Sequence, residues 1–278
     1  MDLDNLVKDL AEYSRMAMNV DQGDYIKDGL IYCGKCNTPK QCRVVIKGVE
    51  LKPMCQCECE MQKWVDHQER LEKQKHDLWI EERRKEALPF ERLRKYRFGS
   101  DLQFDERASK VAVNYVKNFA KMFDKGKGLM LYGNVGTGKT FLSACIVNDL
   151  VDIGYGCYFT SLPRLVNQIS DASEKQKFID HLNKYDLLVI DDLASERDTE
   201  YMNEMVQMVI DQRYQSGKPL IVTTNLTADE LKNPADVKKQ RLFSRLLEMC
   251  IPVEIKGKDR RKEKLKMDYQ ELEEVLGL

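Results

Sequence analysis

The sequence predicts an α/β protein with a parallel sheet and helices on both of its faces, preceded by a small cysteine-rich region. Two observations predict the sheet. From about residue 105, short apolar runs alternate with segments of helical periodicity, and a glycine-rich loop separates one such run from a helix. A third observation predicts the separate region, because six of the nine cysteines fall between Cys33 and Cys59. A chain of 278 residues is long enough for one large and one small domain.

Composition narrows the classes of protein to which the chain can belong. The 45 Lys and Arg residues nearly cancel the 46 Asp and Glu residues, so any binding to nucleic acid must come from local patches. No apolar run approaches the roughly 18 residues that span a bilayer, and the first residues lack the pattern of a signal peptide. We therefore expect a cytoplasmic protein with no membrane partner. In a reducing compartment, clustered cysteines indicate metal binding rather than disulfides.

Two helices are predicted in the N-terminal part of the chain. Leu6 and Leu10, with Val7 and Tyr13, recur at helical spacing and predict a short amphipathic helix over residues 3–17. Residues 61–97 are densely charged and predict a linker helix with a thin apolar stripe, formed by Trp64, Leu71 and Leu78. The stripe favours a solvated helix over a coiled coil because it is too short for the latter.

The cysteine cluster predicts a zinc-binding module within residues 1–60. YCGKC (32–36) and CQCEC (55–59) enclose RVVIKGVEL, which predicts a β-hairpin that turns at Lys47-Gly48. Four thiolates in tetrahedral geometry bind Zn²⁺ tightly and hold together a module too small for a hydrophobic core. The expected ligands are Cys33, Cys36, Cys55 and Cys57, with Cys59 as the alternative to Cys57 and Cys42 as a spare. An iron–sulfur cluster and free structural thiols are the rival interpretations.

The C-terminal region, residues 98–278, is expected to be one domain with five parallel strands. Apolar runs bounded by turn residues or acids predict the strands at 127–133, 155–161, 186–192, 219–225 and 251–257. Helical segments separate them, including one of about twenty residues after the second strand and a basic one near 237–249. Strand–helix alternation of this kind places helices on both faces of the sheet.

The loop between the first of these strands and its helix has the form G-x-x-x-x-G-K-[ST], which predicts phosphate binding. Its glycines allow consecutive N–H groups to face an anion, and the helix that comes next adds its positive dipole end. Lys139 is expected to reach the β- and γ-phosphates of ATP, and the Thr140 hydroxyl is expected to bind Mg²⁺. The expected nucleotide-binding residues are Gly133, Asn134, Val135, Gly136, Thr137, Gly138, Lys139 and Thr140.

Acidic and amide side chains end two further predicted strands. LLVIDD (187–192) places Asp191 where it can hold Mg²⁺, directly or through water, and Asp192 where it can orient or deprotonate an attacking water. IVTTN places Asn225 at the end of another strand, where its amide can position the same water. Each side chain alone could be an ordinary strand-end cap. Together they predict hydrolysis of a nucleoside triphosphate, ATP and water giving ADP and phosphate.

The order of these motifs resembles the AAA+ ATPases, which have a phosphate loop, paired acids, a polar sensor on the fourth strand and then an arginine-bearing helix. The resemblance implies a AAA+ P-loop fold with ATP and Mg²⁺ as cofactors. It also implies that an arginine of QRLFSRLLEMC reaches the γ-phosphate of a neighbouring subunit, so the ATP-bound chain would self-associate. Arg241 matches this role best, and Arg245, one helical turn later, is the other candidate. A solvated basic helix face is the alternative.

Two departures refine the resemblance, which covers roughly residues 95–265. After Gly257 about twenty residues remain, too few for the multi-helix lid of most AAA+ proteins, and Arg260 and Arg261 stand where a second sensor arginine could meet the phosphates. A lidless core of this kind resembles helicase loaders of the DnaC/DnaI type and the IstB-type transposition helpers. Asp192 stands where many AAA+ proteins have Glu, which favours slow, switch-like hydrolysis.

The resemblance implies a function, and the cysteine module favours one branch of it. A zinc-bearing N-terminal half resembles the DnaI-type loaders, so we expect an ATP-dependent loader of a replicative hexameric DnaB-type helicase onto single-stranded DNA. KKQRLFSR (238–245) and KGKDRRKEKLK (256–266) could contact DNA phosphates, or could be solvated basic faces. The alternatives are an IstB-like transposition helper and an adaptor that binds ATP as a structural ligand.

Overall fold

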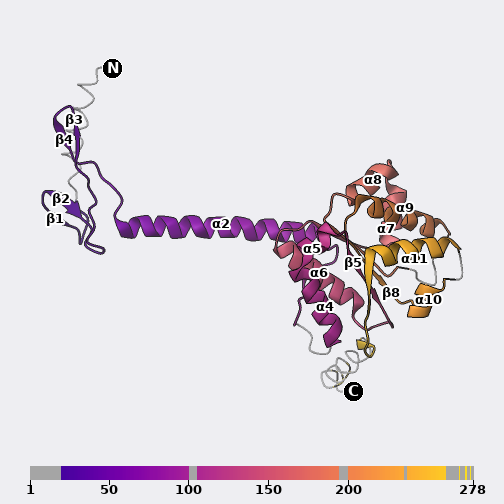
Figure 1. The fold of residues 1–278 in the computed structure, drawn as a ribbon. Coiled ribbons are helices and arrows are strands. Elements are labelled where there is room, and N and C mark those ends of the chain that lie inside the picture. The colour runs from indigo at the N-terminus through magenta and orange to yellow at the C-terminus, as the bar shows by residue number, and fades with distance from the viewer. Residues whose placement is uncertain are drawn as a thin grey trace. The chain divides into compact units, whose positions relative to one another are not determined.

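The computed structural model describes residues 20–99, 105–193, 200–234 and 237–260, together with Tyr269, Glu273 and Leu276. The chain forms two compact units, Met1–Leu78 and Trp79–Leu278, and helix α2 (Glu58–Ala87) contributes residues to both (Figure 1). The helix expected at residues 3–17 lies outside the described residues, as do most of the residues on which the expected lack of a lid depends. The domain limits expected after residues 60 and 97 stay predictions.

The first unit contains two short antiparallel hairpins. Their strands are β1 (Tyr25–Lys27), β2 (Leu30–Tyr32), β3 (Val44–Ile46) and β4 (Val49–Leu51). Lys47 and Gly48 join β3 to β4 with φ of 50° and 80°, the positive pair that a two-residue type I′ turn requires. The hairpin predicted there is confirmed. Asp28 and Gly29 form the same kind of turn between β1 and β2, and this hairpin was not predicted.

Lys40 ties the segment before the first hairpin to the start of α2. Its Nζ lies 2.7 Å from Asp24 Oδ2, 3.2 Å from Asp21 Oδ2 and 3.6 Å from Glu60 Oε1, and the residue is only 8% exposed. Hydrogen bonds to Asp24 and Asp21 raise the pKa of the Lys40 ammonium, so it stays charged. The contact with Glu60 holds the first turn of α2 beside residues 21–40.

The linker helix ends earlier than predicted. It stops at Ala87 because Pro89 lacks a backbone N–H and disfavours helical conformation in the residue before it, and a short helix α3 (Glu91–Arg94) comes next. Ala87 and Leu88 are buried in the core of the second unit. The stripe residues Trp64 and Leu78 are 54% and 68% exposed, as expected of a solvated helix surface.

The second unit is built on a five-stranded parallel sheet with the strand order β6-β7-β8-β5-β9. The strands are β5 (Gly128–Tyr132), β6 (Cys157–Ser161), β7 (Leu187–Asp191), β8 (Leu220–Thr224) and β9 (Cys250–Glu254). All five predicted strands are confirmed. Because β8 lies between β7 and β5, the residues that come directly after these three strands meet at one edge of the sheet.

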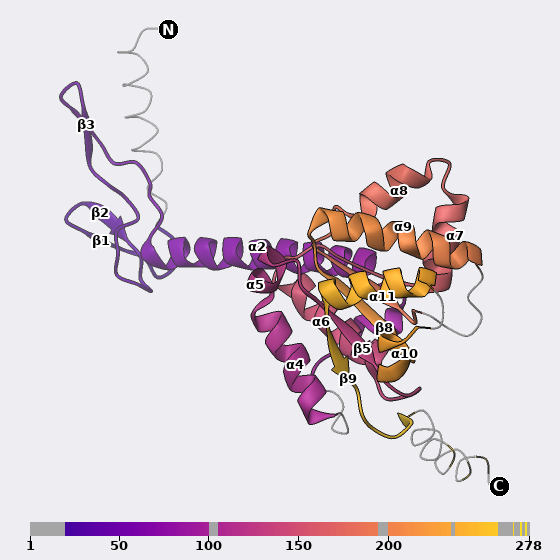
Figure 2. The same cartoon turned by 45° about the vertical axis from the view of Figure 1, so that its right-hand side comes forward.

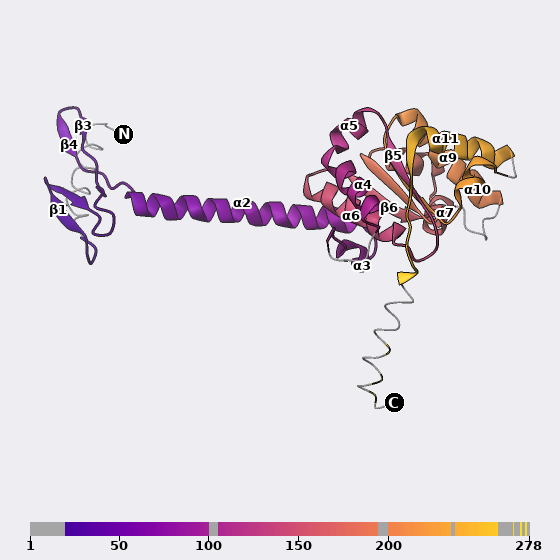
Figure 3. The same ribbon diagram turned by 60° about the horizontal axis from the view of Figure 1, so that its bottom comes forward.

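Helices cover both faces of this sheet, as predicted (Figures 2 and 3). They are α4 (Glu106–Lys117), α5 (Phe119–Asp124), α6 (Lys139–Asp152), α7 (Leu162–Asp171), α8 (Lys175–Leu182), α9 (Glu200–Ser216), α10 (Ala228–Lys232) and α11 (Val237–Met249). Leu187 and Val189 face the core formed with α4, α5 and α6, while Leu188 and Ile190 face the core formed with α7, α8, α9 and α11.

The helical segment after β6 differs from the prediction. The single helix expected there is divided into α7 and α8, because Ala172 takes an extended conformation with φ −69° and ψ 124°. None of the helices in the described part of the chain has the length and apolar character needed to cross a lipid bilayer.

Arg213 on α9 is fully buried. It binds β7 and β8 at the ends where they begin, whereas their site residues lie at the ends where they stop. Its guanidinium donates to the carbonyl oxygens of Tyr185 at 2.9 Å and Asp186 at 2.8 Å, just before β7. It also donates to the carbonyl of Pro219 at 2.7 and 3.1 Å, just before β8. Burial lowers the pKa of Arg213 to about 10, so it remains charged at neutral pH. These bonds fix β7 and β8 relative to each other.

Candidate nucleotide site and metal centre

The phosphate loop lies between β5 and α6, as predicted. Gly133, Gly136 and Gly138 have φ of 138°, 80° and 101°, a region that other residues rarely adopt, so the loop needs glycine at these positions. Lys139 is 7% exposed, and its Nζ donates to the carbonyl oxygens of Gly133 at 2.8 Å and Asn134 at 2.7 Å. The ammonium group is therefore held inside the curve of the loop.

The other predicted loop residues lie around this ammonium group. The Thr137 hydroxyl donates to the Asn134 carbonyl at 2.9 Å and closes the loop from within. The Val135 side chain is 54% exposed at the outer side. Gly138 precedes the first turn of α6, where backbone N–H groups have no partner within the helix. Loop amides, helix start and ammonium thus form a site suited to anionic phosphate.

Thr140 and Asp191 meet where the loop faces the end of β7. The Thr140 hydroxyl lies 3.0 Å from both carboxylate oxygens of Asp191, and the Thr223 hydroxyl donates to Asp191 Oδ1 at 2.6 Å. Burial raises the pKa of the Asp191 carboxyl, and the two hydroxyl donors oppose that rise. A hydroxyl and a carboxylate in contact are the oxygen ligands that Mg²⁺ takes beside nucleotide phosphates, so the residues present fit this ion.

Asp192 and Asn225 are also brought together. Asn225 Nδ2 donates to Asp192 Oδ1 at 3.0 Å, and both residues are exposed at the edge of the sheet. Asp192 has φ of 59°, and its N–H donates to the Thr223 hydroxyl at 2.8 Å. Thr223 therefore orients both acids at once. Thr223 is not among the site residues predicted from the sequence, although it stands two residues before Asn225 near the end of β8.

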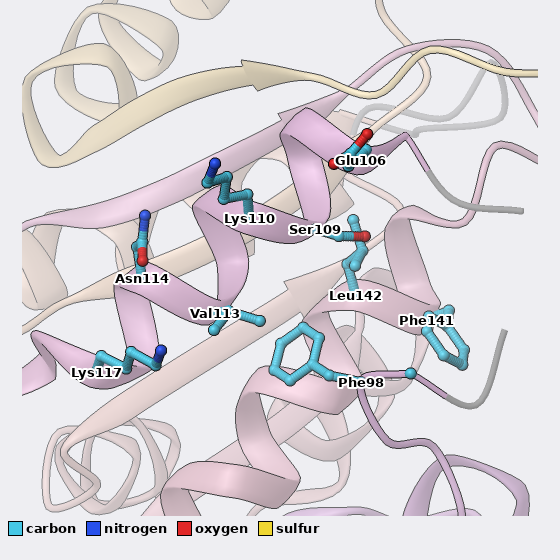
Figure 4. Close-up of a pocket in the computed structure, with 10 residues that line it drawn as sticks. Phe98, Glu106, Ser109, Lys110, Val113, Asn114, Lys117, Phe141 and Leu142 are labelled. Carbon is cyan, nitrogen blue, oxygen red and sulfur yellow. The ribbon is translucent and has the colours of Figure 1, made fainter. Parts of the chain in front are cut away.

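A cavity of about 400 Å³ lies between α4 and the start of α6, and it was not predicted (Figure 4). Phe141 and Leu142 line it directly after the phosphate-loop residues Lys139 and Thr140. The other lining residues are Phe98, Gly99, Glu106, Ser109, Lys110, Val113, Asn114 and Lys117. An aromatic and polar cavity one residue from the phosphate loop can receive a group attached to the phosphates.

Four cysteine sulfur atoms cluster in the first unit. The Sγ atoms of Cys33, Cys36, Cys57 and Cys59 lie within 4.8 Å of one another, with Cys57 and Cys59 3.3 Å apart and Cys33 and Cys59 3.6 Å apart. Thiolates that bind one zinc ion at about 2.3 Å are roughly 3.8 Å apart, so these residues fit a tetrahedral metal site. Among the residues that the structure describes, these four form the group of His, Cys, Asp or Glu side chains that could hold a metal ion.

This cluster differs from the expected ligand set at one position, because it contains Cys59 and not Cys55. The Cys55 N–H donates to the Lys40 carbonyl at 2.7 Å, and its Sγ lies 3.5 Å from the Pro39 carbonyl and beside Cys42. The chain then turns into α2, with the N–H of Met61 bonded to the Cys57 carbonyl at 2.9 Å. That turn brings Cys57 and Cys59 to the same side and leaves Cys55 on the other.

Local hydrogen bonds favour the thiolate form in the C-x-x-C half of the cluster. Backbone N–H groups of Cys36 and Lys35 lower the pKa of the Cys33 thiol. A hydrogen bond with the Thr38 hydroxyl, 3.0 Å away, lowers the pKa of Cys36 to about 6. Burial raises the pKa of Cys57, and the Cys57 thiol raises that of Cys59 to about 12. The C-x-x-C thus has the knuckle geometry in which backbone N–H groups face the thiolates.

Comparison with known proteins assigns the family. The model of the family described as "IstB-like ATP binding protein" matches residues 57–267, well over half of the chain. The chain belongs to the IstB-like ATP-binding family. The match begins at Cys57, so Cys33 and Cys36 precede it. The matched region includes the whole phosphate loop and both acids described above.

Curated relatives include helicase loaders and an insertion-sequence protein. The chain is 31% identical over 163 residues to the replicative helicase loader DnaI of Bacillus subtilis, which covers 53% of this chain and 52% of DnaI. It is 24% identical over 126 residues to the replicative helicase loader DnaC of Escherichia coli, covering 43% and 51% of the two chains. A putative ATP-binding protein in an insertion sequence of Mycobacterium tuberculosis is 24% identical over 59% of this chain and 70% of its own. The chain thus spans about half the length of the two loaders it matches.

Solved structures show the same fold. The DnaC helicase loader structure superimposes with a TM-score of 0.53 at 27% identity, over 60% of this chain and 100% of that one. The DnaI structure gives a TM-score of 0.50 at 23% identity, over 61% and 92%. The predicted AAA+ P-loop fold is confirmed.

The IstB-like chain places its predicted arginines in three different settings. Arg245 forms an ion pair with Asp211 on α9 and is half-buried, so its charge is engaged within its own chain. Arg241 is exposed on α11, one turn earlier. The backbone N–H of Arg260 donates to the Gly136 carbonyl at 3.2 Å, which brings the residue to the phosphate loop. Arg261 lies outside the described residues.

Proposed function

We propose that this IstB-like protein is an ATP-dependent loader of a replicative hexameric DnaB-type helicase onto single-stranded DNA. One observation carries the proposal: Lys139, Thr140 and Asp191 are assembled for ATP and Mg²⁺ in a chain 31% identical to a replicative helicase loader. Cys33 and Cys36, the two residues of the cysteine cluster that precede the family match, support a separate partner-binding unit. The loader acts in the cytoplasm, where its helicase and DNA are found.

Each residue of the site has a task in this proposal. The amides of the loop bind the phosphates, and Lys139 exchanges the carbonyls of Gly133 and Asn134 for phosphate oxygens. Thr140 and Asp191 hold Mg²⁺, which neutralises phosphate charge. Asp192 orients and deprotonates the attacking water, and its hydrogen bond to Asn225 supports a shared role in placing that water. The cavity beside Phe141 takes the nucleobase.

We also infer that Cys33, Cys36, Cys57 and Cys59 hold one zinc ion. The ion supplements the small hydrophobic core in the described part of this unit, where Ile31 and Leu51 are buried but β1 and β3 are exposed along their whole length. Ile26 and Val45 are 60% and 67% exposed, which gives the zinc unit apolar surface for contact with the helicase. We assign helicase binding to this unit and ATP and DNA binding to the other.

Asp191→Asn is expected to bind ATP within about threefold of wild type and to hydrolyse it about 100-fold more slowly, because a neutral amide is a poor Mg²⁺ ligand. The variant keeps the shape of the side chain and an oxygen that can accept from Thr140 and Thr223. Binding is measured by calorimetry and turnover by phosphate release, with single-stranded DNA present and absent. Asp180→Asn on α8 is the matched control. Turnover at the wild-type rate in Asp191→Asn would remove Asp191 from the mechanism.

Arg241→Ala is expected to bind ATP normally and to lose at least about tenfold of its DNA-stimulated turnover, because its exposed guanidinium is available to a neighbouring subunit's γ-phosphate. Arg245→Ala is the matched control on the same helix. It removes an ion pair with Asp211 and should lower stability by about 1 kcal/mol while leaving turnover intact. Mixing Arg241→Ala with Lys139→Ala subunits should restore part of the turnover if the arginine acts between subunits. The reverse pattern, with turnover lost only in Arg245→Ala, would transfer the role.

The loader proposal is tested with purified components. The chain is mixed with the DnaB-type helicase of the same organism and circular single-stranded DNA coated with single-strand-binding protein, and helicase bound to DNA is isolated by gel filtration. We expect helicase on the DNA only with the chain and ATP. Failure of the chain to bind this helicase at micromolar concentrations contradicts the proposal.

A second function is favoured by the family model and by the insertion-sequence relative. As a transposition helper, the chain would bind a transposase of its host instead of the helicase, and its ATPase would respond to double-stranded DNA. Measuring turnover with single-stranded and duplex DNA separates the two functions. An adaptor that uses ATP only as a structural ligand would show no turnover with either.

A further inference from the structure

The segment that leaves the edge strand β9, residues 255–260, lies against the phosphate loop. The Ile255 N–H donates to the Tyr132 carbonyl at 2.8 Å, next to the first residue of the loop. The Lys256 N–H donates to Asp105 Oδ2 at 3.1 Å, on the residue that caps α4. At its far end the segment bonds to the loop through the Arg260 N–H and the Gly136 carbonyl. Three hydrogen bonds donated by its backbone N–H groups, two to carbonyl oxygens and one to a carboxylate, therefore hold it in place.

This arrangement places the carboxylate of Asp259 beside Gly136 of the phosphate loop. A Cβ atom added to Gly136 would lie 2.0 Å from Asp259 Oδ1 and 2.5 Å from its Cγ, closer than any real contact. Glycine at 136 therefore has two roles. It allows the positive φ of the loop, and it leaves room for the Asp259 side chain. A negative charge in contact with a loop built to receive phosphate opposes the ligand's own charge.

We propose that Asp259 is a specificity-determining residue that weakens nucleotide binding by charge repulsion, and weakens it more for the triphosphate than for the diphosphate. The inference rests on the proposed ATP site. The γ-phosphate adds negative charge near the loop, so ATP meets a larger repulsion from Asp259 than ADP does.

Calorimetric titration of the full chain and of Asp259→Asn with ATP and with ADP, in Mg²⁺ and at low and high salt, tests the inference. The amide keeps the size of the side chain and removes only its charge. We expect Asp259→Asn to bind ATP about three- to tenfold more tightly than wild type and ADP by a smaller factor, with both gains reduced at high salt. Asp259→Glu keeps the charge and should discriminate against ATP as wild type does.

Glu254→Gln is the matched control, because it makes the same change of charge at the end of β9, where Glu254 pairs with Lys256 at 3.3 Å. It should leave both affinities within about twofold of wild type, as expected for an exposed ion pair. Unchanged or weaker ATP binding in Asp259→Asn, or an equal gain for both nucleotides, overturns the inference. If wild type still binds ATP, the proposed function survives that outcome; a wild-type chain that binds neither nucleotide overturns both.

Discussion

Lys139→Ala is expected to bind ATP at least about 100-fold more weakly than wild type, a loss on the order of 3 kcal/mol. The Lys139 ammonium is almost fully buried within the loop, 2.8 and 2.7 Å from two carbonyl oxygens, and it needs only a small movement to reach phosphate. In such a site a charge-assisted hydrogen bond competes with little water. Alanine removes this donor and leaves the phosphate charge to the loop amides and Mg²⁺ alone.

Calorimetry with ATP and Mg²⁺ measures the loss directly. Lys177→Ala is the matched control, since the side chain of that lysine is 78% exposed on α8 and forms an ion pair with Glu174. The two variants should unfold within about 3 °C of each other, because the loop lies on the surface of the unit. An affinity for ATP within about threefold of wild type in Lys139→Ala would mean that the loop is not the phosphate site.

The parts of the fold that the sequence predicts well are those encoded by neighbouring residues. The apolar run 187–190 is buried on both faces of the sheet, and a short run of this kind followed by Asp191 indicates a central strand. The phosphate loop is likewise a local pattern, since its glycines set the backbone and Lys139 comes at a fixed spacing. Parallel strands also end at one edge, which is why Asp191 and Asn225 were expected at the same site.

The parts that were missed depend on contacts between distant residues. Arg213 satisfies carbonyl groups at Tyr185, Asp186 and Pro219, and an arginine on an otherwise ordinary helix carries no sign of that burial. Thr223 orients both acids from a neighbouring strand, and the strand order that makes them neighbours is not readable from the residues. The cavity forms between α4 and α6, whose packing decides its shape.

The cysteine cluster differs from the expected ligand set at one position for a related reason. CQCEC places Cys55, Cys57 and Cys59 two residues apart, so spacing alone allows any pair of them. In an extended chain Cys55 and Cys57 would share a face. The structure begins α2 at Glu58, and the Glu58 N–H donates to the Thr38 hydroxyl at 3.0 Å, next to the C-x-x-C motif. The position of the helix start, and not the spacing, selects the pair.

Cys59→Ser is therefore expected to lose the zinc ion, whereas Cys55→Ser is expected to keep about one zinc per chain. Removal of a thiolate from a four-sulfur site takes away much of a binding free energy that is on the order of 10 kcal/mol for structural zinc, and the part of the first unit that the structure describes has little buried apolar surface to replace it. Metal content is measured by mass spectrometry of freshly purified full chain, and affinity by competition with a chromophoric chelator. The Cys59→Ser chain should also be cut by protease within residues 20–60, while Cys55→Ser resists as wild type does.

Both serine changes remove one sulfur from the same short CQCEC segment, so they differ chiefly in whether that sulfur belongs to the cluster. Loss of zinc in Cys55→Ser with retention in Cys59→Ser would favour the ligand set expected from the sequence and overturn the one proposed from the cluster.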